Sequence, residues 1–221
     1  MNNSKKILQI IKDILLIELG LMISSLGTAF FYAANLGSSA MATFSDGLHL
    51  VLNISYGDAN TLANVALLLV LLLLDRSCIN IGTLLCVFTI GPWVNLFTPM
   101  LQGLAIAEQS MAVRVLCSVC GTALMGVGLG LYMAVDRGLG ALEGIVKYLR
   151  THFGIKVRTA KIIQDAVLVL GGIVLGAQWG VGTLIGILCT GPVLQNSNQE
   201  FGKIFRRRKG TAPSGTANIW F

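Results

Sequence analysis

The chain has 221 residues, of which 54% are hydrophobic and only 12% are charged, and its mean hydropathy is +0.76. Soluble domains carry about 25% charged residues, so this composition excludes a soluble globular protein and indicates that lipid surrounds much of the chain. The net charge of +6 does not indicate nucleic-acid binding, because Lys and Arg lie at segment ends and in the tail, where membrane proteins carry them.

The first apolar segment follows Lys5 and Lys6, which is also how a signal peptide begins. This segment is too long for a signal peptide and contains Glu18. We therefore predict that it is a first membrane span that the mature protein retains.

Eight apolar segments follow one another along the chain. They are predicted at 10–34, 38–53, 59–74, 81–98, 112–135, 138–153, 160–175 and 181–198. A helix needs about 20 residues to cross the hydrocarbon core, so the second and third segments of each group of four are short. We predict an all-α polytopic membrane protein with about eight transmembrane helices in a membrane domain at 1–202. A basic, disordered cytoplasmic tail is predicted at 203–221.

The second half of the chain repeats the first at an offset of about 100 residues. Tyr32 to Gly37 returns as Tyr132 to Gly138 with one insertion, Ile81-Gly82-Thr83-Leu84 as Val181-Gly182-Thr183-Leu184, and Gly91-Pro92 as Gly191-Pro192. We predict two tandem four-helix copies, at about 10–98 and 112–198. Duplicated helix bundles are frequent in transporters, which bind their substrates where the copies meet.

The basic residues predict the topology. With eight full crossings, the N-terminal lysines, the cluster from Lys147 to Lys161 and the basic tail all fall on the cytoplasmic side. This arrangement makes the copies parallel and both termini cytoplasmic. In the alternative, the short second segment of each copy is re-entrant, and the copies are inverted.

Polar side chains inside the apolar segments are the candidates for function, because a charge in the bilayer core costs about 2.5–3.5 kcal/mol. The candidate pathway or binding residues are Glu18, Asp46, His49, Asn64, Asn95, Glu143, Lys147, Asp165 and Gln195. In the repeat alignment Asn64 pairs with Asp165, and Asn95 pairs with Gln195. Such pairs suggest one central lining built by both copies, although each side chain could instead bond to a neighbouring helix.

Other candidates do not follow the repeat. Glu143 aligns with Ala42, and Lys147 follows it by four residues, so Glu143 forms either a local ion pair or a substrate contact. Asp46 and His49 share one helix face, which would suit a proton relay. Asp46 also aligns with Lys147, which would allow a pair between copies.

The remaining motifs have structural interpretations. Glu18 lies close enough to the predicted cytoplasmic edge to snorkel. The pairs Gly91-Pro92 and Gly191-Pro192 are expected to kink the fourth helices and to free carbonyl groups near a central site. The chain has no GxSxG, HExxH or Walker motif, and Cys117-x-x-Cys120 has no second ligand pair. We therefore expect no catalytic centre, no metal and no cofactor.

The chain resembles the YczE/YyaS/YitT family of bacterial integral membrane proteins over most of residues 15–198. The resemblance rests on Ala34-Asn35-Leu36-Gly37, Gly82-Thr83-Leu84 with Gly91-Pro92, and Gly138-Leu139-Gly140, Gly182-Thr183-Leu184 and Gly191-Pro192. The acids Glu143 and Asp165 match positions where family members tend to carry Asp or Glu. Relatives often have Ser-Pro, an aromatic residue and Asp in segment two, where this chain has Ser39-Ala40-Met41-Ala42.

The resemblance implies a multi-pass protein of the bacterial cytoplasmic membrane and specifies no activity. The intramembrane polar residues favour a small-solute or ion transporter with a pathway between the copies. The alternative is a non-transporting regulatory factor that binds a protein partner at its basic cytoplasmic face. The lipid bilayer is a partner in either case, and nucleic acid is not.

Overall fold

The computed structural model describes residues 3–209, which form helices and no strands. The α-helices are α1 (Asn3–Ala34), α2 (Ala40–Leu52), α3 (Tyr56–Leu74), α4 (Ile81–Gln102), α5 (Met111–Ala134), α6 (Ala141–Phe153), α7 (Val157–Val174) and α8 (Val181–Lys209). Two 3₁₀ turns, η1 (Arg76–Cys78) and η2 (Ile106–Glu108), lie in the connections. The eight predicted segments are thus confirmed as helices. The predicted disordered tail is wrong for 203–209, where α8 continues, and 210–221 lies outside the described residues.

Polar residues at the helix ends determine where the helices begin and stop. The Ser55 side chain accepts a hydrogen bond from the Asp58 N–H at the start of α3, and Asn80 forms a capping box with Thr83 at the start of α4. These caps satisfy N–H groups that have no acceptor in the first turn. Both short helices end at a residue in the left-handed conformation, α2 at Asn53 and α6 at Gly154.

Apolar side chains cover the outside of the bundle. Leu73 is 85% exposed, and Val174 is 84% exposed. By length and composition, α1 from Ile7, α3, α4 and α5 could each cross a membrane. An apolar exterior of this extent fits a lipid environment.

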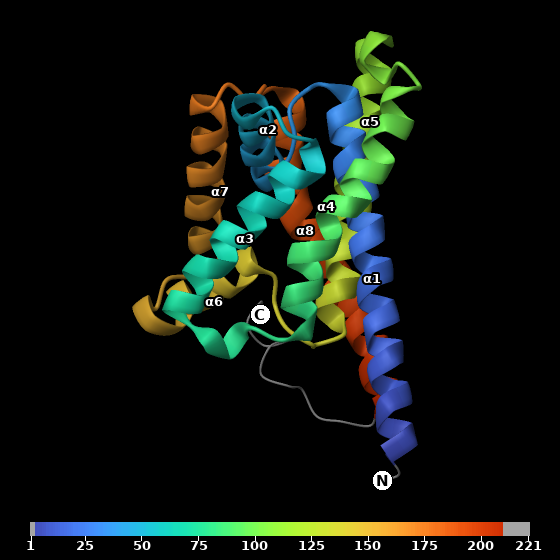
Figure 1. The fold of residues 1–221 in the computed structure, drawn as a ribbon, viewed down its shortest axis with the longest axis vertical. Coiled ribbons are helices and arrows are strands. Elements are labelled where there is room, and N and C mark those ends of the chain that lie inside the picture. Colours follow the sequence, from blue (N-terminus) through green and yellow to red (C-terminus); the bar gives the residue numbers. More distant parts are fainter. Residues whose placement is uncertain (1–2, 210–221) are drawn as a thin grey trace.

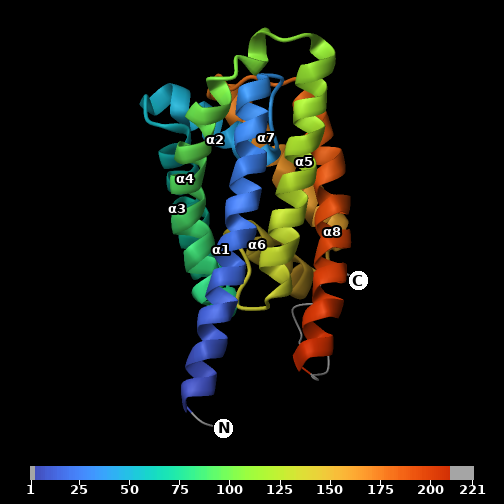
Figure 2. The same cartoon turned by 90° about the vertical axis from the view of Figure 1, so that its right-hand side faces the viewer.

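Helices α1 and α5 lie side by side along one face of the bundle (Figure 1) and run antiparallel, as Figure 2 shows. Glycines allow the two backbones to touch. A Cβ atom added to Gly20 would lie 2.7 Å from the carbonyl oxygen of Gly128, and one added to Gly121 would lie 2.8 Å from that of Gly27. This contact is the small-residue packing of membrane helices.

Arginines connect these helices at both ends. Arg137, just after α5, contacts the buried Asp13 near the start of α1 at 2.7 Å. At the other end Arg114 donates from Nε to the Ala34 carbonyl at 2.8 Å and from an η nitrogen to the Asn35 carbonyl at 2.6 Å. The predicted parallel arrangement is therefore wrong, because parallel copies would place Arg137 at the end of the bundle away from Asp13.

The short helices α2 and α6 lie at opposite ends of the bundle (Figure 1). Each has 13 residues and is about 20 Å long, against about 30 Å of hydrocarbon. Helix α2 packs beside the C-terminal part of α7, where Thr43 meets Gly172, and α6 beside that of α3, where Gly144 meets Leu71. The prediction of eight full crossings is not confirmed, since neither short helix is long enough.

Candidate functional site

A cavity of about 80 Å³ lies between the two halves of the chain. Helices α1 to α6 all contribute to its wall. Its polar side chains are Ser24, Thr28, Ser39, Asn60, Asn64 and Glu143. A water occupies about 30 Å³ in the liquid, so the space suits a ligand of few heavy atoms.

Both short helices begin at this cavity. The wall includes Ser39, Met41 and Ala42 from the start of α2, and Gly140 to Glu143 from the start of α6. The first N–H groups of a helix lack acceptors, and the helix dipole places partial positive charge there. Two such ends therefore meet at a single polar cavity.

The two helix starts differ in charge. The Glu143 carboxylate folds back over its own first turn, so that a Cβ atom added to Gly140 would collide with Oε2. The carboxylate also interacts with its own backbone N–H. The corresponding position of α2 is Ala42, and the N-cap residue Ser39 makes no capping hydrogen bond. The start of α2 is therefore uncharged and uncapped.

Three of the polar side chains in the wall have hydrogen-bonding groups without a partner in the described part of the chain. They are the hydroxyl groups of Ser24 and Ser39 and the amide nitrogen of Asn60, in residues that are 4%, 8% and 4% exposed. Buried polar groups are normally satisfied. Their orientation at a cavity indicates that a ligand or water completes them.

Corresponding helices carry different pairs at matching depth. In α3, the Asn64 side chain donates to Asn60 Oδ1 at 2.8 Å. In α7, the aligned residues Lys161 and Asp165 form an ion pair of 2.7 Å. Asn64 lies in the cavity wall, whereas Asp165 is buried, lies outside the wall and pairs with Lys161.

Asp46 and His49 lie near one end of the bundle rather than at the central cavity. Asp46 accepts a 3.3 Å hydrogen bond from the Gln178 N–H and lines a smaller cavity of about 20 Å³. The His49 ring stacks on Tyr56, and its Nδ1 contacts the Ile54 carbonyl oxygen. A bonded relay between Asp46 and His49 is not seen.

The predicted ion pairs of Lys147 are not found among the described side chains. Glu143 lies four residues before Lys147 but turns back to the start of α6. Asp46 belongs to α2 and Lys147 to α6, which lie at opposite ends of the bundle (Figure 1). Both pairing predictions are therefore wrong.

Other predicted residues have local roles. Glu18 accepts a 3.4 Å hydrogen bond from Trp93 Nε1, and Asn95 caps the start of α3 by accepting from the Gly57 N–H at 2.8 Å. Gln195 is half-buried on α8, outside the cavity wall.

The Gly-Pro pairs do not reach the cavity. Gly91 packs against α3 at Gly57 and Thr61, a Cβ atom on Gly191 would meet nothing within 4 Å, and both prolines are exposed. The expectation that these kinks open onto the central site is wrong.

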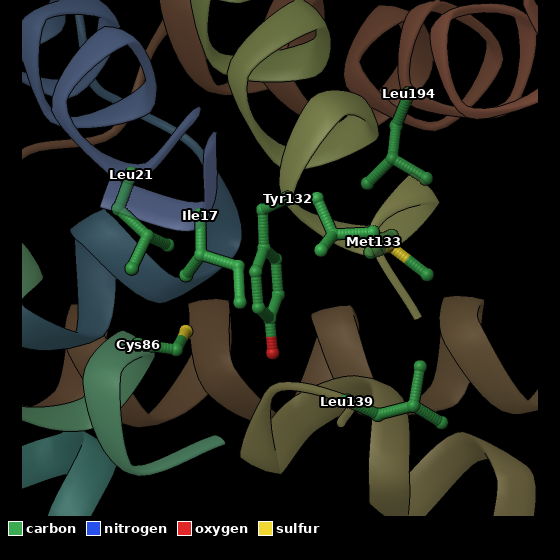
Figure 3. Close-up of a cluster of buried hydrophobic side chains, with 8 residues drawn as sticks. Ile17, Leu21, Cys86, Tyr132, Met133, Leu139 and Leu194 are labelled. Carbon is green, nitrogen blue, oxygen red and sulfur yellow. The ribbon is translucent and has the colours of Figure 1, made fainter. Parts of the chain in front are cut away.

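The apolar cluster beneath the cavity contains a polar group that the sequence analysis missed. The Tyr132 side chain is 1% exposed and packs with Ile17, Cys86 and Met133, and among the described residues the Cys86 thiol is the polar group that interacts with its hydroxyl. Figure 3 shows this hydroxyl pointing away from the ribbon that carries Tyr132. Ser24, Ser39 and Asn60 were missed as well. Only Asn60 had a signal, since it aligns with Lys161.

Comparison with known proteins gives relatives without an assigned activity. Residues 11–199 match a family described as "Family of unknown function (DUF6198)". An "Uncharacterized protein" of Haemophilus influenzae is 24% identical over 83% of this chain and 82% of its own length. In Bacillus subtilis, the "Uncharacterized membrane protein YczE" is 26% identical over 57% of this chain and 56% of its own. The "Uncharacterized protein YyaS" of Bacillus subtilis is 22% identical over 80% of this chain and 87% of its own length. No solved structure matches.

Proposed function

We propose that this chain, which belongs to the DUF6198 family, is a transporter that moves a small solute or ion through its central cavity. The observation that carries the proposal is that α2 and α6 both begin at a polar cavity inside an otherwise apolar bundle. Interrupted helices whose N-termini meet near the membrane midplane are a recurrent way to build a transporter site.

The proposal includes an inverted duplication, with α1–α4 as one copy and α5–α8 as the other. Each copy makes the same contact with the other copy, through equivalent residues. The Gly82 N–H donates to the Arg137 carbonyl at 2.9 Å, and the Gly182 N–H donates to the Leu36 carbonyl at 2.9 Å. In this way the loop after the first helix of each copy meets the start of the fourth helix of the other copy.

In the proposed topology α1, α3, α4, α5, α7 and α8 cross the membrane, and α2 and α6 are re-entrant. Both described chain ends then lie on one side, which the positive-inside rule makes cytoplasmic. The turn between α6 and α7, with Lys147, Arg150 and Lys156, lies on that side too. The basic residues thus fit this topology as well as they fit eight crossings.

An inverted pair suits transport because one structure can open to either side by exchanging the conformations of its copies. The cavity walls come from both copies, so a relative movement of the copies would change access from each side. Close packing of α1 on α5 through glycines provides a contact between the copies about which such a movement could occur.

The test is flux in liposomes that contain the purified protein. We expect at least one of chloride, nitrate, formate, ammonium, sodium and urea to enter faster than in protein-free liposomes. Glu143→Gln should change this flux at least tenfold, whereas Glu108→Gln, which alters an exposed acid in the connection between copies, should not change it.

If the folded protein moves none of these solutes, the proposal fails in favour of the partner-binding factor. A Glu143→Gln flux equal to that of wild type would contradict the central pathway.

A further inference from the structure

Resting on the transport role proposed above, we infer that the cavity binds a compact monovalent anion at the first turn of α2, together with one proton on Glu143. Chloride, nitrate and formate represent this class of ligand. The argument depends on which charges and which free donors face the cavity.

The fixed charges around the cavity nearly cancel when Glu143 is ionised. Each helix N-terminus contributes about half a positive elementary charge, so α2 and α6 together contribute about one. Among the described residues of the wall, Glu143 is the one carboxylic acid, and Lys, Arg and His are not among them. Once it is protonated, the cavity is left with about one uncompensated positive charge, and one anion would balance it.

The donors for an anion lie at the start of α2. The first hydrogen bond within this helix runs from the Thr43 N–H to the Ser39 carbonyl at 2.8 Å, so the N–H groups of Ala40, Met41 and Ala42 have no acceptor in the helix. At α6 the Glu143 carboxylate lies beside Gly140 and interacts with its own backbone N–H. A second anion site at α6 is therefore blocked by the protein's own carboxylate.

Side-chain donors without partners complete the site. The hydroxyl groups of Ser24 and Ser39 and the amide nitrogen of Asn60 border the same cavity, and each belongs to a residue more than nine-tenths buried. They are a second, independent observation at the same cavity, because these donors belong to side chains, whereas the start of α2 offers backbone N–H groups. A cation would lie against two positive helix ends, and the one carboxylate is already engaged with α6.

The charged side chains near Glu143 oppose each other, since Lys161 attracts its carboxylate and Asp165 repels it. On α7, Lys161 and Asp165 pair with each other at 2.7 Å. Cys86 on α4 and Tyr132 on α5 complete the titratable groups that interact with Glu143. Both are buried, and a thiol and a phenol are neutral over the range in which a carboxyl group titrates.

The test is isothermal titration calorimetry on the detergent-purified chain with sodium chloride, nitrate and formate, and with sodium gluconate as the control for ionic strength and sodium. Titrations in buffers of different ionisation enthalpy measure proton uptake. We expect about one proton per anion, and therefore an affinity that falls about tenfold per pH unit once Glu143 is ionised.

Two variants that change the charge at the start of α6 or of α2 make the test more specific. Glu143→Gln should bind the anion with no proton uptake and no pH dependence. Ala42→Glu, which places at α2 the carboxylate that α6 has, should lose binding at least tenfold. The control Glu108→Gln should behave as wild type. Wild-type measurements alone decide the inference if a variant does not fold.

The inference is overturned if folded wild-type protein binds none of the three anions at any pH. It is also overturned if binding takes up no proton at every pH tested and the affinity does not change with pH. The experiments distinguish failure of the transport proposal from failure of this inference. Anion binding with proton uptake but no flux in liposomes would leave the site standing and remove the transporter. Flux of urea or sodium without anion binding would do the reverse.

Discussion

The first turns of α2 and α6 occupy equivalent places in the two halves of the bundle and have opposite chemistry. Gly140 and Ser39 are their N-cap residues, and both helices start at the same cavity. Three residues on, α6 carries Glu143, and α2 carries Ala42. The backbone contacts that place these helices agree between the halves, whereas the side chains that face the cavity do not. The shared part is therefore scaffold, and the differing part is where selectivity would reside.

The two halves also differ in their polar side chains deeper in the bundle. Asn60 and Asn64 on α3 correspond to Lys161 and Asp165 on α7, and both pairs are joined by short side-chain contacts. The pair on α3 is thus neutral, whereas the pair on α7 consists of two opposite charges that interact with Glu143. Both halves keep a polar i,i+4 pair at this depth, because an unpaired polar group in a membrane interior is costly.

The largest expected effect concerns topology. A cysteine replacing Glu108 in an otherwise cysteine-free chain should react with a membrane-impermeant maleimide in intact cells. A cysteine at Lys156, which lies on the cytoplasmic side in both topologies, should react only after permeabilisation. If neither cysteine reacts in intact cells, both positions are cytoplasmic. That result would favour eight crossings and contradict the inverted arrangement of the two halves.

The two arginine contacts between α1 and α5, made by Arg137 and Arg114, are expected to contribute differently to the free energy of unfolding. Arg137→Gln removes the 2.7 Å ion pair between Arg137 and the buried Asp13 carboxylate and should lower the free energy of unfolding by about 3 kcal/mol. Arg114→Gln removes hydrogen bonds to backbone carbonyl groups that end α1 and should cost about 1.5 kcal/mol. Chemical denaturation in detergent, followed by circular dichroism, measures both. Equal losses would show that the buried charge is not the source of the difference.

Replacing a glycine in the contact between α1 and α5 by a larger residue should destabilise the protein. Gly20→Ala forces a Cβ atom to 2.7 Å from the Gly128 carbonyl oxygen and should destabilise the protein by about 1–3 kcal/mol. The matched control is Gly191→Ala, which points into open space and should be neutral or stabilising by up to about 1 kcal/mol. Thermal unfolding of the two variants side by side checks the prediction, which fails if both shift equally.

The smallest expected difference separates the two threonines at the starts of α4 and α8. Thr83 donates to the Leu139 carbonyl at 2.6 Å and also accepts from the Asn80 N–H, whereas Thr183 accepts from the Gly180 N–H at a long 3.4 Å. Thr83→Val should cost about 1–2 kcal/mol and Thr183→Val less than about 1 kcal/mol. The same denaturation assay compares them, and a larger loss at Thr183 would reverse the comparison.

Much of the helical framework could be predicted from the sequence. Apolar runs and the polar residues at their ends located all eight segments, because a chain in lipid must satisfy its backbone within helices. Glu143 was found because a charged side chain inside an apolar segment is costly, and it departs from the predicted repeat by its alignment with Ala42. Ser24 and Ser39 were not found, because hydroxyl side chains in membrane helices usually bond to their own backbone, as Thr28 does to the Ser24 carbonyl.

The charge pattern could not distinguish the two arrangements of the halves. Lys147, Arg150 and Lys156 fall on the same side as the termini whether or not α2 and α6 cross. The ion pair between Asp13 and Arg137 decides the relative direction of α1 and α5, and it joins residues 124 positions apart. No local pattern predicts a contact of that separation.

By itself, the sequence determined that this protein is helical, that lipid surrounds it, and that its few internal polar groups are the places to look for function. These properties follow from composition and from short-range periodicity. Only the tertiary structure decided that α1 and α5 run antiparallel, that α2 and α6 begin at one cavity, and that Asp165 is satisfied by Lys161. These outcomes depend on packing between distant segments, since which polar groups remain free is settled only when neighbouring helices have satisfied the others.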